Sequence, residues 1–388
     1  MTPAARVAAA IDILDRYLAG EAAEKVLTNW ARGNRYAGSS DRAAIRDHVF
    51  DAIRCRRSFG FLGGQETGRG LMIGACRASG VTPDEIFTGE RYAPAPLSDD
   101  ERTAPDLGTA PRAVRLDVQD WLLERFDACL GPDCDAILDR LRSRAPLFLR
   151  VNTARCTRQE AIERLAEDSV VAVPNALAST ALEVVENPRR VAMSTCYKAG
   201  LVELQDAGSQ AVVERLPVSG ADRILDFCAG GGGKSLAMAA MGATNITAHD
   251  ADATRMADLP VRAARAGVEI ERADRDALKG QSFDLILCDV PCSGSGAWRR
   301  SPDSKWRLRA ADLSQLMTLQ REILDEAQEH ARTGATLALV TCSLLREENE
   351  DLAAGFLERH PQWTLQQQDR ISPLGGSDGF YFSLFKRD

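Results

Sequence analysis

Residues 224–235 read ILDFCAGGGGKS, and this stretch carries most of the information about the fold. An apolar run ends at Asp226 and leads into four glycines, Gly230 to Gly233, which are followed by a segment with helical character. Glycines at such a place let a ligand approach the backbone and leave the N–H groups at the helix start free to bind it. The stretch therefore predicts a strand, a turn and a helix, with a ligand site at the turn.

Several interpretations of this turn compete. A Walker A loop requires a glycine where the chain has Cys228, so a loop of that kind is excluded. A dinucleotide loop of the form GxGxxG fits Gly230 and Gly232 but then meets Ser235. A loop for a nucleoside cofactor such as S-adenosylmethionine is the third interpretation, and a tight turn without a ligand stays open.

The segments that follow alternate regularly between strand-like and helix-like patterns. Strands are expected at 223–228, 245–249, 268–272, 283–289 and 335–341, and helices at 233–241, 252–266, 310–332 and 346–359. Such alternation predicts a doubly wound, mainly parallel α/β sheet for residues 220–388. The segment GFYFSLFK at 379–386 adds a late strand that could run antiparallel.

Three regions precede this domain. Residues 1–88 show apolar stripes at helical spacing and no strand alternation, so they predict an all-α domain with one basic helix face. Residues 89–112 hold four prolines and several acids, which is typical of a linker. Residues 113–219 are expected to be helical to about Arg144 and then to form a small α+β module. Its expected elements are strands at 146–153, 181–186 and 200–206 and a helix at 157–167.

Composition narrows the class of protein. The 48 Lys and Arg against 56 Asp and Glu give a formal charge of −8, which argues against polyanion binding by bulk charge but not by a local basic patch. The ten cysteines form no CxxC pair and the four histidines lie far apart, so no metal site is expected. The apolar runs fall short of the roughly 20 residues of a membrane helix, and charges interrupt the N-terminal one. We expect a cytoplasmic protein with reduced cysteines.

Acidic residues end the next two expected strands. Asp250 follows the second strand, where a carboxylate can accept hydrogen bonds from ribose hydroxyls. Asp274 follows the third strand, where it could bind an adenine amino group. Asp252 is expected to cap a helix.

The segment FDLILCDVPCSGSGAWRRSPDSKW at 283–306 combines an acid, a thiol and a basic run. Its strand delivers Asp289 to the carboxyl edge of the sheet, where ligands bind in open α/β sheets. The turn that follows exposes the thiol of Cys292. Cations near Trp298 and Trp306 would suit an extruded nucleotide, although both tryptophans could also be core residues.

A second thiol is expected at the same edge of the sheet. The segment ATLALVTCSLLREENE at 335–350 is a strand that ends in Thr341, Cys342 and Ser343. A single cysteine is more often inert than reactive. Two cysteines at neighbouring strand ends beside a cofactor loop favour a catalytic pair.

These motifs together resemble the RNA 5-methylcytosine methyltransferase family of the bacterial Sun/Fmu (RsmB-like) type. Its patterns DxCAAPGGKT, DAPCSGxG…RR.PD.KW and TCSxxxEENE stand here as DFCAGGGGKS, DVPCSGSGAWRRSPDSKW and TCSLLREENE. LQDAGSQ at 204–210 and the ending GSDGFYFSLFK are also similar to the family. The N-terminal SSDRAAIRDHVFDAIR resembles the NusB-like RNA-binding domain of bacterial members.

The resemblance implies a Rossmann-like class I methyltransferase that uses S-adenosylmethionine to methylate C5 of a cytosine in RNA. It implies Cys342 as the nucleophile at C6, Cys292 as the residue that assists product release, Asp289 as the partner of the base, and Lys234 as an electrostatic aid to the thiolate. The implied cofactor residues are Cys228, Ala229, Gly230, Gly231, Gly232, Gly233, Lys234, Asp250, Arg255, Asp274 and Asp289. The expected RNA contacts are Arg150, Arg299, Arg300, Lys305 and Trp306.

The sequence departs from the family pattern at two places. Glycine replaces the usual proline at 231 or 232, and Pro260 is expected to kink the helix that follows Asp250.

Three competing functions stay open beside methylation of small-subunit ribosomal RNA. A DNA cytosine-5 methyltransferase would use Cys292 as the nucleophile, but its Glu-Asn-Val segment is absent. An enzyme that acts on tRNA would need the same catalytic residues. A non-catalytic RNA-binding scaffold would keep the basic faces without needing both thiols. We expect a monomer.

Overall fold

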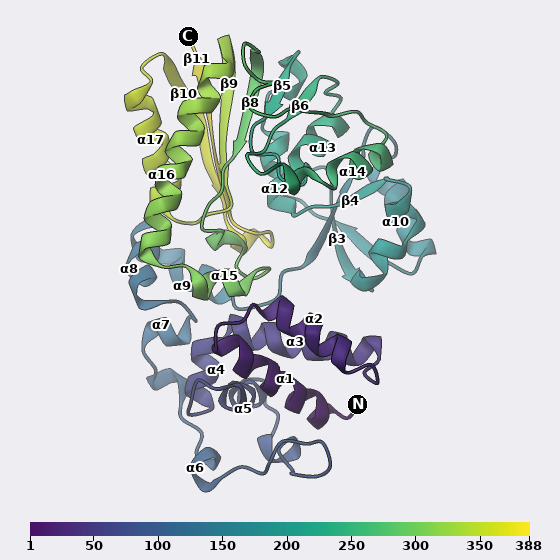
Figure 1. Cartoon of the computed structure of the whole chain (residues 1–388), viewed down its shortest axis with the longest axis vertical. Coiled ribbons are helices and arrows are strands. Elements are labelled where there is room, and N and C mark those ends of the chain that lie inside the picture. Colours follow the sequence, from purple (N-terminus) through teal and green to yellow (C-terminus); the bar gives the residue numbers. More distant parts are fainter. The chain divides into compact units, whose positions relative to one another are not determined.

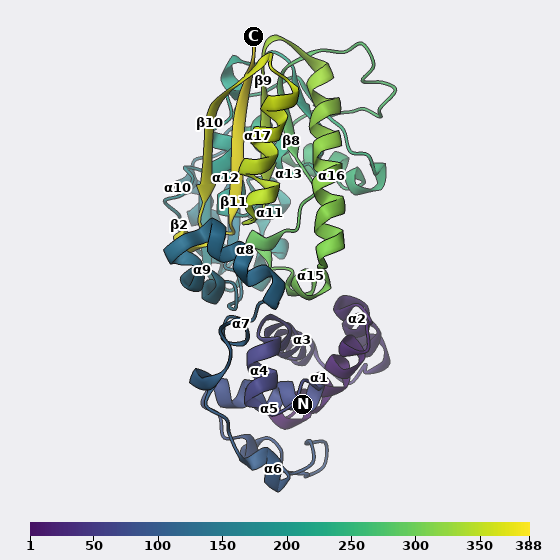
Figure 2. The same cartoon turned by 90° about the vertical axis from the view of Figure 1, so that its left-hand side faces the viewer.

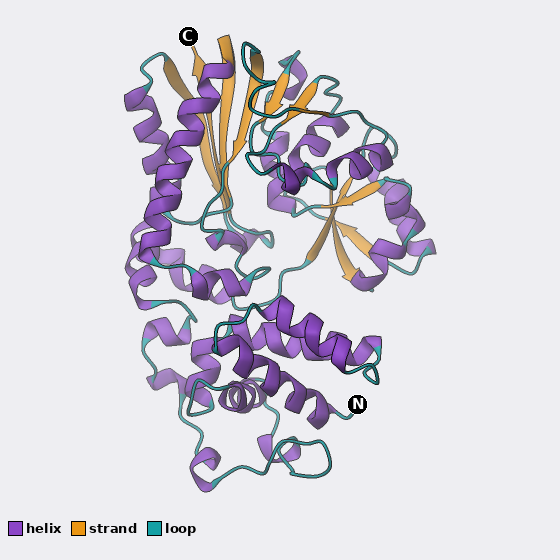
Figure 3. Cartoon of the chain, in the orientation of Figure 1, coloured by secondary structure: helices purple, strands orange, loops and turns teal.

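The computed structural model describes all 388 residues and divides into two compact units. The first unit contains Met1–Arg144 and the distant segment Trp298–Arg307, and the second contains Ala145–Ala297 and Leu308–Asp388. Figure 1 labels the elements, and Figure 3 shows that all strands belong to the second unit. No helix combines the length and the apolar character that a membrane span requires.

The first unit is helical throughout. Its helices are α1 (Pro3–Leu18), α2 (Ala23–Gly33), α3 (Ser39–Arg54), α4 (Arg56–Leu62), α5 (Gly68–Ala78), α6 (Asp99–Arg102), α7 (Arg112–Arg115), α8 (Asp120–Leu130), α9 (Cys134–Arg140) and α15 (Pro302–Arg307). The apolar stripes of α1, α3 and α5 meet in one core, in which Ile13, Ile45 and Ile73 are fully buried. Spacings of three and four residues place such side chains on one helix face.

The boundary expected at residue 112 is displaced. The first unit continues through α8 and α9 to Arg144, because Phe126 of α8 packs edge to face on Trp298 with their ring centroids 5.9 Å apart. Trp298 is therefore a core residue of this unit. The stretch expected to be a linker also contains a short helix, α6, with a capping box between Ser98 and Glu101.

The second unit begins with a small antiparallel sheet in the order β2-β3-β1-β4. Its elements are β1 (Leu147–Val151), α10 (Arg158–Glu167), β2 (Val171–Pro174), β3 (Ala181–Glu186), α11 (Thr195–Lys198) and β4 (Val202–Leu204). The expected strands and the helix capped by Thr157 are present, and the Thr157 hydroxyl accepts the Glu160 N–H at 3.2 Å. The short exposed strand β2 was not expected.

A seven-stranded sheet in the order β10-β11-β9-β8-β5-β6-β7 forms the rest of the second unit. Its strands are β5 (Ile224–Asp226), β6 (Ile246–Ala248), β7 (Glu271–Arg272), β8 (Phe283–Asp289), β9 (Ala331–Thr341), β10 (Trp363–Ile371) and β11 (Phe380–Arg387). Strands β7, β6, β5, β8 and β9 run parallel, and β11 and β10 are antiparallel additions. The doubly wound fold is confirmed. Of the seven strands in this sheet, β10 is the one that was not expected from the sequence.

Helices cover both faces of this sheet. They are α12 (Ala207–Glu214), α13 (Gly233–Ala240), α14 (Leu259–Ala266), α16 (Ala310–Ala327) and α17 (Glu350–Arg359). Alternate residues of one strand enter different cores: Leu285 packs with α12 and α13, whereas Ile286 packs with α16 and α17. Figure 2 shows α16 and α17 lying along the sheet.

The chain order changes direction at β5. From β5 the chain builds β6 and β7 on one side and then crosses to β8 and β9 on the other. In open α/β sheets, ligands bind at the carboxyl ends of the strands beside such a switch point. A ligand site is therefore expected at the loops that follow Asp226 and Asp289.

Pro260 does not kink a long helix. The expected helix 252–266 is divided into a 3₁₀ turn at Ala253–Met256 and the helix α14, in which Pro260 lies in the first turn. Proline is tolerated there because the first N–H groups of a helix lack intrahelical partners. The predicted cap at Asp252 is confirmed, since its carboxylate accepts the Thr254 N–H at 3.0 Å.

Candidate active site

The glycine loop joins β5 to α13 in a conformation that needs glycine. Gly230 and Gly232 have φ of 52° and 76°, a region that side chains disfavour. A Cβ on Gly232 would lie 2.2 Å from Cδ1 of Leu259. The loop therefore packs against the start of α14 with no room for a larger residue at this position.

Asp250 holds the loop from the end of β6. Its buried carboxylate accepts the N–H of Gly230 at 2.9 Å and that of Asp252 at 3.0 Å. The guanidinium of Arg255 lies 3.1 Å away. The predicted acid at the second strand end is thus placed directly beside the glycine loop.

A cavity of about 970 Å³ opens next to Asp250. Four predicted cofactor residues line it: Cys228, Asp250, Arg255 and Asp274. Residues that the sequence analysis missed complete the wall, among them Phe227, His249, Met256, Arg272, Glu322 and Glu326. Phe227 and His249 directly neighbour the predicted residues in sequence, whereas Glu322 and Glu326 are brought in by α16, which no local motif marks.

The lining suits an adenosine cofactor with a charged amino-acid end. Phe227 and Met256 offer apolar surface for a base, and Asp250 and Glu322 offer carboxylates for hydroxyl or ammonium groups. Asp274 also accepts the N–H of Ala277 at 2.8 Å, so it shapes its own turn as well.

A lysine and an acid that were both predicted to bind the cofactor contact each other at the same edge of the sheet, although neither lines this cavity. Lys234, from the first turn of α13, donates to Oδ2 of Asp289 at the end of β8, at 2.5 Å. Burial by itself would lower the pKa of Lys234, but the Asp289 carboxylate outweighs this effect and the pKa is raised. The sulfur of Cys342 also interacts electrostatically with this ammonium.

The two predicted thiols are in contact. Sγ of Cys292 lies 3.5 Å from Sγ of Cys342, although the residues are 50 positions apart. The hydrogen bond with Cys342 and then burial raise the pKa of Cys292 well above its ordinary value. The arrangement thus keeps a proton on Cys292 beside the second sulfur.

The ring of Phe380 is a further neighbour that the sequence analysis did not single out. The Lys234 ammonium lies 5.6 Å from its centroid, within the range of a cation–π contact. Phe380 occupies the first position of β11, within the chain ending that is similar to the family.

Most of the expected RNA contacts are buried instead. The guanidinium of Arg150 donates to Gln205 Oε1 at 2.5 Å and to the carbonyl of Gly233 at 2.8 Å, and burial lowers its pKa to about 10. Arg299 and Lys305 are also buried, and the Lys305 ammonium donates to the Arg54 carbonyl at 2.8 Å. The expectation that these three side chains contact RNA is wrong, because they are enclosed by protein.

Trp306 is likewise a structural residue. Its indole N–H donates to the carbonyl of Ile53 at 2.6 Å, and its ring packs on the core of the first unit. The last carbonyls of a helix lack intrahelical partners, so Trp306 and Lys305 together cap the end of α3. Arg300 is exposed, and its contact with RNA stays a prediction.

Two family models match the chain. The model described as 16S rRNA methyltransferase RsmB/F matches residues 213–382, and the ferredoxin-like domain of RsmF/B-like methyltransferases matches residues 118–192. The ribosomal RNA small subunit methyltransferase B of Yersinia enterocolitica is 32% identical over 283 residues, which are 69% of this chain and 66% of that protein. The chain belongs to the RsmB/F methyltransferase family. The protein of the same name from Pectobacterium carotovorum is 31% identical over 68% of this chain and 65% of its own length.

Solved structures share the fold of this chain. The protein PH0851 aligns over 100% of this chain and 99% of its own, with a TM-score of 0.76 and 20% identity. A methyltransferase homologue from Pyrococcus horikoshii covers 71% of this chain and 98% of its own, with a TM-score of 0.60 and 22% identity. The cofactor of the family is S-adenosylmethionine, which the cavity beside Asp250 suits. The match to the curated relatives spans slightly less than two thirds of their length.

Proposed function

We propose that this protein transfers a methyl group from S-adenosylmethionine to C5 of a cytosine in small-subunit ribosomal RNA. The observation that carries the proposal is the 3.5 Å contact of the Cys292 and Cys342 sulfurs near the Lys234–Asp289 pair. Pro291, which directly precedes Cys292, lines the cofactor cavity. The names of the curated relatives support ribosomal RNA as the substrate.

The chemistry begins at Cys342. C5 of cytosine is a poor nucleophile, and addition of the Cys342 thiolate to C6 makes C5 enamine-like. The nearby ammonium of Lys234 stabilises the thiolate, and Asp289 hydrogen-bonds the base at N3 or its amino group as the thiolate adds. Bound S-adenosylmethionine supplies an electrophilic methyl group, which C5 takes from the sulfonium.

Cys292 acts in the second half of the reaction. The methylated adduct must lose its C5 proton, and the electron pair that is left re-forms the C5–C6 double bond as the Cys342 sulfur departs. Cys292 lies against that sulfur. Its thiol gives its proton to the departing Cys342 sulfur, and the Cys292 thiolate that is left accepts the proton from C5. Product release therefore depends on the second thiol, whereas bond formation depends on the first.

Substitution of each cysteine tests the assignment. With labelled S-adenosylmethionine and small-subunit RNA, Cys342→Ala is expected to abolish transfer, and Cys292→Ala is expected to trap a protein–RNA adduct that survives denaturation. Cys76→Ala, in the core of the first unit, is the control. The reverse pattern, with the adduct in Cys342→Ala, would instead assign the nucleophile to Cys292.

Binding of the cofactor and the identity of the RNA need separate measurements. Asp250→Ala is expected to weaken S-adenosylmethionine binding about tenfold or more in calorimetry, because a buried hydrogen-bonding carboxylate is lost. Asp258→Ala, at an exposed position, is the control. No binding by the unchanged protein would favour a scaffold. Bisulfite sequencing of RNA from cells with and without the gene separates ribosomal RNA from tRNA.

A further inference from the structure

The turns that carry both thiols converge on one buried acid, Glu348. Its Oε1 accepts the N–H of Ser293 at 2.8 Å and the amide of Gln320 at 2.9 Å. Its Oε2 accepts the hydroxyls of Ser293 and Ser343, each at 2.5 Å. Ser293 directly follows Cys292 and Ser343 directly follows Cys342. The Glu348 carboxylate therefore binds both of the turns that carry the thiols.

Further hydrogen bonds join the two turns around this carboxylate. The N–H of Gly296, in the first turn, donates to the carbonyl of Cys342 at 2.9 Å. The hydroxyl of Ser295 accepts the N–H of Leu344 at 2.8 Å and lies 3.2 Å from that of Ser343. These contacts join residues about 50 positions apart without Glu348, which adds its own hydrogen bonds to Ser293 and Ser343.

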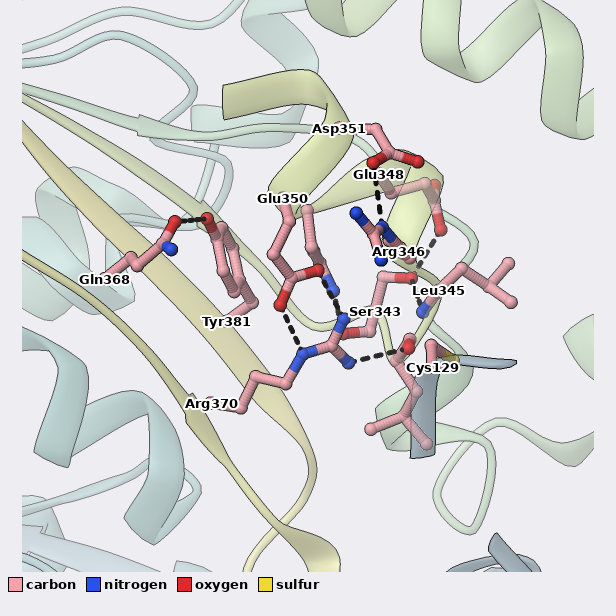
Figure 4. A network of polar contacts seen from close by, with 12 residues as sticks. Cys129, Ser343, Leu345, Arg346, Glu348, Glu350, Asp351, Gln368, Arg370 and Tyr381 are labelled. Carbon is pink, nitrogen blue, oxygen red and sulfur yellow. Dashed lines mark hydrogen bonds and ion pairs between the residues drawn. The ribbon is translucent and has the colours of Figure 1, made fainter. Parts of the chain in front are cut away.

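Other braces hold the second turn from outside. Figure 4 shows Glu348 next to Ser343, and it shows the ion pair of Arg370 with Glu350 nearby. The Arg370 guanidinium also donates to the carbonyl of Leu344 at 2.8 Å. Asn349 donates to the carbonyl of Ser343 at 3.0 Å. These braces leave Glu348 as the carboxylate that contacts both turns directly.

The four donors around Glu348 explain why its length and shape matter. Its two oxygens reach donors on two turns and on α16 at once, so a shorter side chain would release one side. Glutamine has the same length. Its oxygen could face the two nitrogen donors at the Oε1 position, and its amide nitrogen could donate to the serine hydroxyls, which can rotate to accept.

We propose that Glu348 is a positioning residue that fixes the separation of the Cys292 and Cys342 thiols. It holds the turn after each cysteine, so its removal lets the turns drift apart while the strands stay in place. The consequence for methyl transfer rests on the proposed function, but the thiol geometry does not.

A cross-linking rate measures this geometry without RNA or cofactor. Diamide, an oxidant, takes two electrons and two protons from a pair of thiols and leaves a disulfide. Both cysteine residues are partly exposed, and their sulfurs lie 3.5 Å apart, so a small approach brings them to the roughly 2.0 Å of a disulfide bond. The Cys292–Cys342 disulfide is followed by mass spectrometry of the peptides, and Cys292→Ser confirms its assignment.

The variants separate positioning from simple loss of stability. Glu348→Ala is expected to slow cross-linking about tenfold or more, whereas Glu348→Gln is expected to stay within about threefold of the unchanged protein. Glu358→Gln, on the exposed face of α17, is the matched control and is expected to leave the rate unchanged. Thermal unfolding checks that each variant is folded.

Two results would overturn the proposal. One is a folded Glu348→Ala protein that cross-links as fast as the unchanged protein. If that variant does not fold, Ser343→Ala serves instead, because it removes one contact and leaves Glu348 its other three donors. An unchanged rate in Ser343→Ala would count against the proposal equally. If the unchanged protein transferred no methyl group to RNA while the variants cross-linked at the expected rates, only the proposed function would be contradicted.

Discussion

The ammonium of Lys234 donates to the carboxylate of Asp289 across the switch point of the sheet, at 2.5 Å. Lys234 comes from the helix after β5 and Asp289 from the end of β8, so the pair links the cofactor loop to the strand that leads to Cys292. This contact places a positive charge within electrostatic range of the Cys342 sulfur. We therefore expect the lysine to control the reactivity of that sulfur.

Loss of the Lys234 charge should slow catalysis more than it weakens cofactor binding. Lys234→Met keeps most of the apolar stem but removes the cation that stabilises the thiolate, so kcat for methyl transfer should fall about 10²-fold or more. Single-turnover kinetics with labelled S-adenosylmethionine measure this effect. Lys279→Met, at an exposed lysine paired with Asp276, is the control. An unchanged kcat would show that Lys234 does not contribute to catalysis.

A methyl group on Gly232 should disturb the cofactor loop. Gly232→Ala places a Cβ against Leu259 and also adopts an unfavourable positive φ, so the free energy of unfolding should fall by about 1–3 kcal/mol. Chemical denaturation measures the loss, and calorimetry should show weaker cofactor binding. Gly220→Ala has open space around its Cβ and an ordinary φ, so it should change neither quantity.

Asp226 should make stability depend on pH. It is fully buried, and burial raises its pKa to about 7, although the Ser235 hydroxyl that donates to it at 2.5 Å opposes this rise. The folded protein therefore binds a proton more tightly than the unfolded chain, whose carboxyl titrates near 3.8. The protonated Asp226 side chain thus contributes to the free energy of unfolding. This contribution is complete below about pH 4 and is lost as the pH rises to about 7.

Asp226→Asn tests this dependence. Relative to the unchanged protein, the variant should gain stability between pH 5 and pH 8, by at most about 3 kcal/mol. Unfolding curves at both pH values measure the gain, with Asp222→Asn at an exposed position as the control. A constant difference between the two proteins at all pH values would show that Asp226 does not titrate in this range.

Lys305 should matter for stability rather than for RNA affinity. Its buried ammonium donates to the Arg54 carbonyl at the end of α3, so Lys305→Met should lower the free energy of unfolding by about 1–3 kcal/mol. RNA affinity of the folded variant should stay near that of the unchanged protein in a filter-binding assay. Arg300→Ala, at the exposed neighbour, should weaken binding and reduce its salt dependence.

Local sequence was enough for the parallel sheet and for much of the site. Hydrophobic runs that end in Asp226, Asp289 and Thr341 place the residues after them at one edge of the sheet, because parallel strands share their carboxyl edge. The positions of Asp250 and of both catalytic cysteine candidates follow from that rule. The helix caps at Thr157 and Asp252 could be predicted from the sequence, because a capping side chain binds a backbone N–H only two or three residues further along the chain.

The tertiary structure decided which polar residues face solvent and which hold the protein together. In the sequence, a run of basic residues looks the same whether its side chains bind RNA or the carbonyls at the end of a helix. Only the contacts with α3 show that Lys305 and Trp306 are structural residues. Contacts between segments far apart in sequence, such as Glu348 with Ser293 and Glu322 in the cavity wall, leave no local pattern. The residue types that the chemistry needs were therefore visible in the sequence, but their distances and burial depend on long-range packing.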